Sequence, residues 1–134
     1  MKMPLHTPIK EEIIEQIKKV IEARNDCELT LRESFGTTYW LMDKEGTNEF
    51  RISSLGTYRV TISRVCFKNR RRGTMTSIVG ILIDYCQREG ISEILIQSVE
   101  TPEMMAFCLK NGFVPSEWNI PTEDVLLGDY ILKI

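Results

Sequence analysis

The fold is decided by one stretch of the sequence, which reads Val65-Cys66-Phe67-Lys68-Asn69-Arg70-Arg71-Arg72-Gly73-Thr74-Met75-Thr76. Strand-like residues run into this stretch from position 58, and apolar residues at helical spacing follow it from Ile78 to Cys86. A strand therefore passes through a basic turn directly into a helix. Backbone N–H groups at a helix start are unpaired, and the helix dipole attracts anions there. We interpret the turn as a phosphate-binding site.

The residues around this turn predict a parallel crossover. The helix after the turn is closed by Gly90, a typical C-cap, and residues 91–99 are typical of a buried strand. Ligands of α/β sheets usually bind at the mouth of such a crossover. Guanidinium groups at residues 70–72 would add charge-assisted hydrogen bonds, and Gly73 would let the backbone approach a bulky ligand. A solvated basic turn is the alternative interpretation of such a charge run taken alone.

The N-terminal half predicts a helix followed by an antiparallel meander. Thr7-Pro8 is typical of a helix start, and isoleucines from Ile9 to Ile21 recur at helical spacing. Strand-like runs follow at residues 27–31, 38–42, 49–53 and 58–62. They are separated by Gly36, Gly46 and Gly56.

The C-terminal part completes the predicted fold. Thr101-Pro102 repeats the cap-then-proline signature before a short helix that Gly112 ends, and residues 125–127 and 130–134 are predicted as two final strands. We expect one domain spanning residues 1–134. Its class is α/β (α+β), with a mixed, mostly antiparallel central sheet, one parallel crossover and flanking helices.

Composition excludes several classes of function. The 134 residues are 43% apolar, which suffices for one core, and 17 basic against 19 acidic residues give a net charge of −2. This balance and a pI near 5.5 argue against a dedicated nucleic-acid binder. No CxxC motif occurs and His6 is the single histidine, so we expect no metal site. Without a signal peptide or an apolar run of ~20 residues, we expect a cytoplasmic protein with no membrane association.

Residues 65–75 are similar to the coenzyme A signature of the Gcn5-related N-acetyltransferase (GNAT) superfamily. That signature is Gln or Arg, two residues, Gly, one residue, then Gly or Ala. Arg70 and Gly73 match it, and Val65 occupies the family's hydrophobic position at the end of the fourth strand. Met75 stands where the family has a small residue.

A second block, residues 101–113, resembles a later helix of the same family. Lys110, Gly112 and Phe113 match the family pattern. Cys108 stands where the family usually has a tyrosine that protonates the departing coenzyme A thiolate. Cys108 is therefore a candidate general acid, although its apolar neighbours on the helix equally fit a packing role.

The resemblance implies the acyl-CoA N-acyltransferase fold, with acetyl-CoA as co-substrate. An amine of a small molecule or protein would attack the thioester, and a backbone N–H of the split fourth strand would polarise its carbonyl. The coenzyme would be bound by Val65, Phe67, Arg70, Arg71, Arg72, Gly73, Thr74, Met75 and Thr76. Pairing into a homodimer is common in the family.

Several alternatives stay open at this level. No residue stands out as the general base, and the candidates are Glu33, Asp43, Glu49 and Glu100. Arg59 and Arg64 either are ordinary outward-facing strand residues or orient an acidic acceptor. The chain could also bind acyl-CoA without efficient catalysis, in a regulatory role, or use residues 68–72 to contact nucleic-acid phosphates.

Overall fold

The computed structural model describes residues 9–70 and 72–134. These residues form three helices and eight strands. In chain order the elements are α1 Glu11–Asn25, β1 Leu29–Ser34, β2 Thr38–Asp43, β3 Glu49–Leu55, β4 Arg59–Cys66, α2 Thr74–Glu89, β5 Glu93–Val99, α3 Pro102–Lys110, β6 Val114–Pro115, β7 Ile120–Pro121 and β8 Leu126–Lys133.

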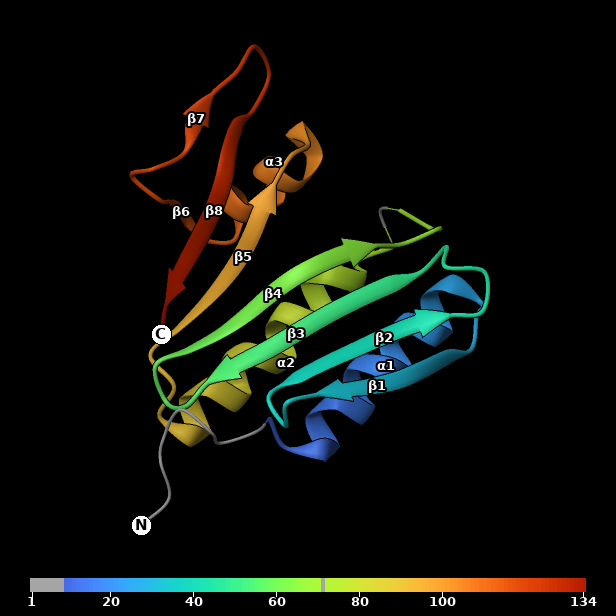
Figure 1. The fold of residues 1–134 in the computed structure, drawn as a ribbon. Helices are drawn as coiled ribbons and strands as arrows, with labels where there is room; N and C mark the ends of the chain where they lie inside the picture. The colour runs from blue at the N-terminus through green and yellow to red at the C-terminus, as the bar shows by residue number, and fades with distance from the viewer. Residues whose placement is uncertain (1–8, 71) are drawn as a thin grey trace.

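One mixed sheet organises the molecule (Figure 1). Its strand order is β1-β2-β3-β4-β5-β8-β6, with β7 paired to β8 at the side. Every pairing is antiparallel except that of β4 with β5, which α2 connects as a crossover. The predicted fold class, a mostly antiparallel sheet with one parallel crossover, is confirmed.

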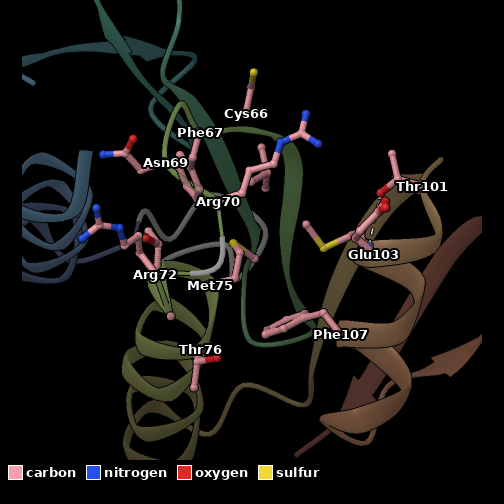
Figure 2. A pocket seen from close by; sticks show the side chains of 14 residues that line it. Cys66, Phe67, Asn69, Arg70, Arg72, Met75, Thr76, Thr101, Glu103 and Phe107 are labelled. Atoms are coloured by element: carbon pink, nitrogen blue, oxygen red, sulfur yellow. Dashed lines mark hydrogen bonds between the residues drawn. The ribbon is translucent and has the colours of Figure 1, made fainter. Parts of the chain in front are cut away.

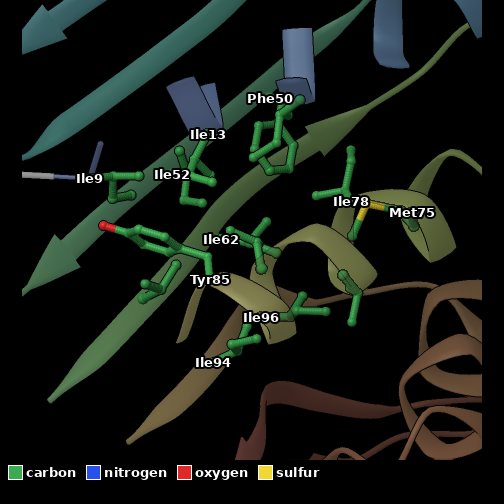
Figure 3. Close-up of a cluster of buried hydrophobic side chains, with 14 of the residues drawn as sticks. Ile9, Ile13, Phe50, Ile52, Ile62, Met75, Ile78, Tyr85, Ile94 and Ile96 are labelled. Atoms are coloured by element: carbon green, nitrogen blue, oxygen red, sulfur yellow. The ribbon is translucent and has the colours of Figure 1, made fainter. Parts of the chain in front are cut away.

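Helices α1 and α2 contact one another and cover one face of β1–β4, as Figure 1 shows. The apolar core lies between these helices and the sheet (Figure 3). Strand β2 and the first half of β4 alternate buried and partly buried residues, because only one face of each packs on the helices. No helix in the described part of the chain lies on the opposite face of β1–β4.

Local cap chemistry sets the ends of α2 and α3 as the sequence predicts. Gly90 adopts a left-handed conformation with φ 72° and donates its N–H to the carbonyl of Cys86. Thr101 caps α3, because its hydroxyl accepts a hydrogen bond from the Met104 N–H at 3.2 Å. Pro102 follows at the first helical position, where its missing N–H costs nothing.

The predicted start of the first helix is wrong. Thr7 and Pro8 lie outside the described residues, and α1 begins only at Glu11. Ile9 precedes the helix and is nevertheless buried. Its carbonyl accepts a hydrogen bond from the Tyr39 hydroxyl at 3.1 Å, which fixes this residue against the sheet without helical structure.

The first strand starts two residues later than expected. Asp26 ends α1 in a left-handed conformation, and the Cys27 N–H donates to the carbonyl of Glu22. The Leu29 N–H then donates to Oε2 of Glu22 at 2.8 Å. The residues that leave the helix thus complete its cap before the strand begins.

The two predicted final strands are one strand, β8. Gly128, with φ 141°, lies inside this strand and faces Val99 of β5 without interrupting it. Asn119, in the connection between β6 and β7, fixes that connection to β8. Its side chain accepts a hydrogen bond from the Asp129 N–H and donates one to the Asp129 carbonyl. The two-residue strands β6 and β7 escaped prediction, since they are too short to show a period-2 pattern.

None of the described helices has the length and apolar character that crossing a membrane requires.

Candidate functional site

The parallel strands β4 and β5 separate along their length. They pair only where Arg59–Ile62 faces residues 93–96. Beyond that point Ser63 forms a bulge in β4, because Ile62 and Arg64 pair with consecutive residues of β3. In β5, Ser98 adopts φ 55° and donates its N–H to Oδ1 of Asp129 at 2.9 Å. Both irregularities lie where the strands part, so the sheet opens into a cleft.

Two cavities adjoin in this cleft. The larger one, of about 360 Å³, lies between the start of α2 and helix α3 (Figure 2). The smaller one, of about 220 Å³, occupies the split between β4 and β5. Both are lined by Val65, Thr101 and Met104, so one continuous surface leads from the helix terminus into the split sheet.

The basic turn before α2 is anchored to two distant elements. The Lys68 N–H donates to Oδ1 of Asn48 at 2.8 Å, and the Asn69 N–H donates to Oδ1 of Asn25 at 2.9 Å. The side-chain amide of Asn69 donates in turn to the carbonyl of Arg24. Asn25 and Asn48 are buried, so the acceptor side of the first two bonds is shielded from water.

Arg24 of α1 completes the anchoring. Its guanidinium donates to the carbonyl of Arg72 at 2.6 Å and to the hydroxyl of Ser77 at 3.0 Å. Gly73, the next residue in the chain, has φ 71°. A Cβ added to it would come within 3.2 Å of the Arg24 Nη1. Both the conformation and the space at this position favour glycine. Arg24, Asn25 and Asn48 had no signal in the sequence, because they lie far from the motif.

The start of α2 offers unsatisfied donors to the larger cavity. Gly73 provides no side-chain cap, and the first backbone bond of the helix runs from the Ser77 N–H to the Gly73 carbonyl. The N–H groups of the first turn therefore lack intrahelical partners. Thr74 is buried, and within the described structure its hydroxyl oxygen has no hydrogen-bond partner. An anion with several acceptor oxygens is the ligand that suits this end of the cavity.

The structure brings nearly all the residues of the predicted coenzyme site together. The residues of that set that line the larger cavity are Val65, Phe67, Arg70, Arg72, Gly73, Thr74, Met75 and Thr76. Arg71 lies outside the described residues. The Met75 side chain is 9% exposed, and Met75 both lines this cavity and packs in the core cluster.

Cys108 is placed apart from the cavities. It is fully buried in the core, and burial raises the pKa of its thiol to about 12. The α3 side chains that line the larger cavity are instead Glu103, Met104 and Phe107. This placement favours packing, and a role for Cys108 as general acid stays a prediction.

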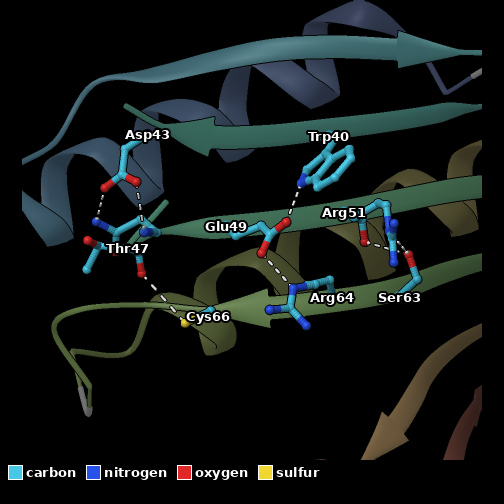
Figure 4. Close-up of polar contacts among 9 residues, drawn as sticks. Trp40, Asp43, Thr47, Glu49, Arg51, Ser63, Arg64 and Cys66 are labelled. Atoms are coloured by element: carbon cyan, nitrogen blue, oxygen red, sulfur yellow. Dashed lines mark hydrogen bonds and ion pairs between the residues drawn. The ribbon is translucent and has the colours of Figure 1, made fainter. Parts of the chain in front are cut away.

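Among the candidate bases, Asp43 and Glu49 already accept hydrogen bonds from other residues of the sheet and its turns. Both Asp43 oxygens accept from Asn48, at 3.1 and 2.8 Å. Burial acts to raise the pKa of the Asp43 carboxyl, but hydrogen bonds from this turn outweigh it and hold the pKa below its usual value. Glu49 accepts from Arg64 and from the Trp40 indole, each at 2.6 Å (Figure 4).

The other two candidates differ in position. Glu33 is exposed on β1, at the edge of the sheet that is remote from β5. Glu100 lines the smaller cavity at the end of β5. It is the candidate base that the described structure places at the split between the strands.

Comparison with known proteins gives structural matches alone. No protein-family model and no curated protein matches the sequence. Ard1 from Thermoplasma volcanium is 12% identical, with 96% of this chain and 95% of that chain covered and a TM-score of 0.52. Arabidopsis thaliana Naa50, solved with the bisubstrate analogue CoA-Ac-MVNAL, is 13% identical over 96% and 97% of the two chains, with a TM-score of 0.51.

A GNAT family acetyltransferase from Elizabethkingia anophelis with acetyl-CoA bound is 12% identical. The match covers 96% of this chain and 92% of that chain, with a TM-score of 0.50. At such identities the likeness concerns the fold.

Proposed function

We propose that this chain, which has the fold of the Gcn5-related N-acetyltransferases, is an acetyl-CoA-dependent N-acetyltransferase that acts on a primary amine. One observation carries the proposal: the cavity at the uncapped start of α2 adjoins the cavity in the split between β4 and β5. An elongated ligand with phosphates at one end and a reactive group at the other fits this arrangement.

The coenzyme would lie with its pyrophosphate at the start of α2. The backbone N–H groups of residues 74–76 would donate to its oxygens. Arg70 and Arg72, both exposed beside the cavity, would add charge-assisted bonds. Because backbone groups supply most of these donors, Met75 can replace the family's small residue without removing a bond.

The thioester would then reach the split of the sheet. Within the described structure, residues 63–66 of β4 have no strand partner on the side of β5. Their backbone N–H groups on that side would polarise the thioester carbonyl. The amine nitrogen attacks the carbonyl carbon, the C–S bond breaks, and the amide forms. Coenzyme A leaves as a thiolate and takes up a proton, while the amine nitrogen loses one.

Glu100 is the group we assign to remove the amine proton. Glu100 lines the smaller cavity, where the amine would meet the thioester, and it would take the proton directly or through a water molecule. The remaining acceleration would come from positioning amine and thioester together.

A second candidate is an acyl-CoA-binding domain with little turnover and a regulatory role. The burial of Cys108 favours it, because α3 then directs no proton donor of that kind into the cleft. Under this hypothesis the coenzyme binds as above, but no amine is acetylated efficiently. A cytoplasmic location and a homodimer stay predictions under either function.

A thermal-shift comparison with acetyl-CoA, coenzyme A and ADP, followed by a turnover assay on an amine panel, separates the candidates. A ligand at about 100 times its Kd stabilises the fold by roughly 2.7 kcal/mol. Stabilisation by acetyl-CoA with amine-dependent release of coenzyme A supports the transferase. Stabilisation without turnover supports the binding domain. No response to acetyl-CoA, with oligonucleotide binding that falls steeply with salt, would support phosphate-backbone contacts by residues 68–72 instead.

A further inference from the structure

Three arginines and a tryptophan form one row across the helix-free face of the sheet. In the strand register, Arg32 of β1 faces Trp40 of β2, Trp40 faces Arg51 of β3, and Arg51 faces Arg64 of β4. Their neighbours in these strands, such as Leu31, Leu41, Phe50 and Ile52, pack on the opposite, helix-covered face. We call Arg32, Trp40, Arg51 and Arg64 the arginine row.

The row concentrates positive charge on a chain whose net charge is −2. Arg51 and Arg64 face each other directly, and like charges in that relation destabilise a sheet. Glu49 bonds Arg64 and is the single acidic residue on the helix-free face of β1–β4 within the described residues. Arg59, also on this face, is already paired with Glu93 of β5. A surface on which arginines outnumber carboxylates attracts anionic ligands.

The two central guanidinium groups are held in place through one nitrogen each. The Arg51 Nε donates to the Ser63 hydroxyl at 3.0 Å, and its guanidinium carbon lies 5.3 Å from the centre of the Trp40 ring. The Arg64 Nε donates to Oε1 of Glu49, whose Oε2 accepts from Trp40 (Figure 4). Within the described structure the Nη groups of both arginines have no hydrogen-bond partner. They are oriented and available to a ligand.

The row ends at the cleft. Arg64 lines the smaller cavity together with Glu100, and its side chain is 58% exposed. Arg32, at the other end, is exposed on the edge strand β1. Three interstrand spacings of ~4.8 Å place the two ends of the row roughly 14 Å apart.

We propose that the arginine row binds acidic side chains of a polypeptide acceptor whose amine enters the split between β4 and β5. The inference rests on the transferase function proposed above. An extended peptide rises ~3.3 Å per residue, so the row spans about four residues next to the reacting amine. Glutamate or aspartate at these positions would form charge-assisted hydrogen bonds with the free Nη groups.

The contacts that Trp40 makes favour a peptide over a single-stranded nucleic acid as the ligand of the arginine row. Nucleic-acid platforms combine basic residues with aromatic rings on which bases stack. Here one face of the Trp40 ring is covered by Arg51, and its N–H is bonded to Glu49. The ring therefore holds the arginine and glutamate in position, and its covered face is closed to a base.

The test uses two fluorescent synthetic peptides that begin with a free alanine amine, followed by four glutamates in one and four glutamines in the other. Their Kd values are measured by anisotropy on the protein saturated with coenzyme A, at low and moderate salt. We expect the glutamate peptide to bind about tenfold more tightly or better, with the difference shrinking as salt rises. Arg51→Gln and Arg32→Gln should each remove several-fold of this preference.

Arg88→Gln is the matched control, because Arg88 is an exposed arginine of α2 that is bonded to Asp84 and distant from the row. It should leave the preference unchanged. Equal Kd values for the two peptides would overturn the proposal, as would tighter binding of an oligothymidylate than of the glutamate peptide. Arg32 is exposed on the edge strand, so Arg32→Gln should fold. It therefore tests the arginine row even if Arg51→Gln does not fold.

Thermal shift with acetyl-CoA on the same samples keeps the two proposals apart. A chain that binds acetyl-CoA and treats the peptides alike loses only the acceptor assignment. A chain that prefers the glutamate peptide but shows no response to acetyl-CoA refutes the transferase function, and with it the claim that the bound peptide is an acceptor.

Discussion

Strands β4 and β5 are joined at one end and parted at the other, and the two ends differ in chemistry. At the joined end, Glu93 is buried and bonded to Arg59 at 2.8 Å and to Lys133 at 3.0 Å, beside a regular backbone ladder. At the parted end, Ser63 and Ser98 disrupt the ladder and polar side chains line a cavity. One strand pair is thus closed by the ion pairs of a buried glutamate at one end and open as a cleft at the other.

This difference separates two kinds of substitution. Changes at the parted end should alter ligand binding and turnover with little effect on folding, because the groups there are exposed or unpaired. Changes at the joined end or in the core should alter the free energy of unfolding and leave the cleft's chemistry intact. Each of the following substitutions tests that separation.

Gly73→Val should have the largest effect and remove coenzyme binding, by about 100-fold or more in Kd. A branched side chain at φ 71° is strained, and its Cβ would displace Arg24 from the turn. Titration calorimetry with acetyl-CoA measures the loss, and thermal melting checks that the fold persists. Arg72→Ala, which removes one exposed guanidinium beside the same cavity, should weaken binding less. Equal affinity in parent and Gly73→Val would mean that the pyrophosphate binds elsewhere.

Glu100→Gln should lower kcat by roughly 100-fold with nearly unchanged coenzyme affinity, since a general base contributes about 10²–10⁴ to a rate. Steady-state turnover of an accepted amine over a pH series is the measurement. Glu33→Gln is a suitable control, because Glu33 is exposed on β1, away from the cleft. If both variants turn over like the parent, then water or another group removes the proton.

Glu93→Gln tests the joined end and should lower the free energy of unfolding by about 2 kcal/mol at neutral pH, without changing acetyl-CoA affinity. Burial acts to raise the pKa of the Glu93 carboxyl, but the bonds and charges of Lys133 and Arg59 outweigh it and lower the pKa. A carboxyl with a lowered folded-state pKa stabilises the fold above its unfolded pKa of ~4.3.

The Glu93 contribution is therefore lost as pH falls from that value through the folded-state pKa. Urea unfolding at several pH values should show parent and Glu93→Gln differing most near pH 7 and converging below about pH 4. If the difference in the free energy of unfolding stays constant across this pH range, the effect of the substitution does not come from the carboxylate charge.

Cys108→Ala should have the smallest effect, a loss of about 1 kcal/mol in stability with acetyl-CoA binding and most turnover retained. Because the thiol pKa is about 12, its removal should leave the pH profile of turnover unchanged in the ordinary range. Chemical denaturation measures the loss of stability, and turnover at several pH values tests the pH profile. A drop in kcat of about 100-fold at unchanged coenzyme affinity would make Cys108 the general acid after all.

Local chemistry explains which features could be predicted from the sequence. The caps at Gly90 and Thr101 and the turn up to Gly73 depend on neighbouring residues, so their pattern is visible in the chain. The merger of the last two predicted strands depends on Gly128 pairing with Val99, a contact between distant residues. No local pattern contains that information.

The same distinction applies to the site. The predicted residues that line the larger cavity all lie between Val65 and Thr76, so one contiguous motif contained them. Glu103, Met104 and Phe107 of α3 also line the cavity and were not predicted. Arg24 and Asn25 reach the turn from α1 and Asn48 from the β2–β3 connection, more than 15 residues away in each case. The arginine row requires the register of four strands, so single arginines in the sequence could not reveal it.

The anchoring of the basic turn by two buried asparagines has a consequence for hydrogen exchange. The amides of Lys68 and Asn69 belong to a surface turn, yet their acceptors Asn48 and Asn25 are shielded from water. Both amides can exchange with solvent only when the turn detaches from α1 and from the β2–β3 connection. Their protection factors should therefore resemble those of core amides, and the turn should move together with these two elements as one cooperative unit.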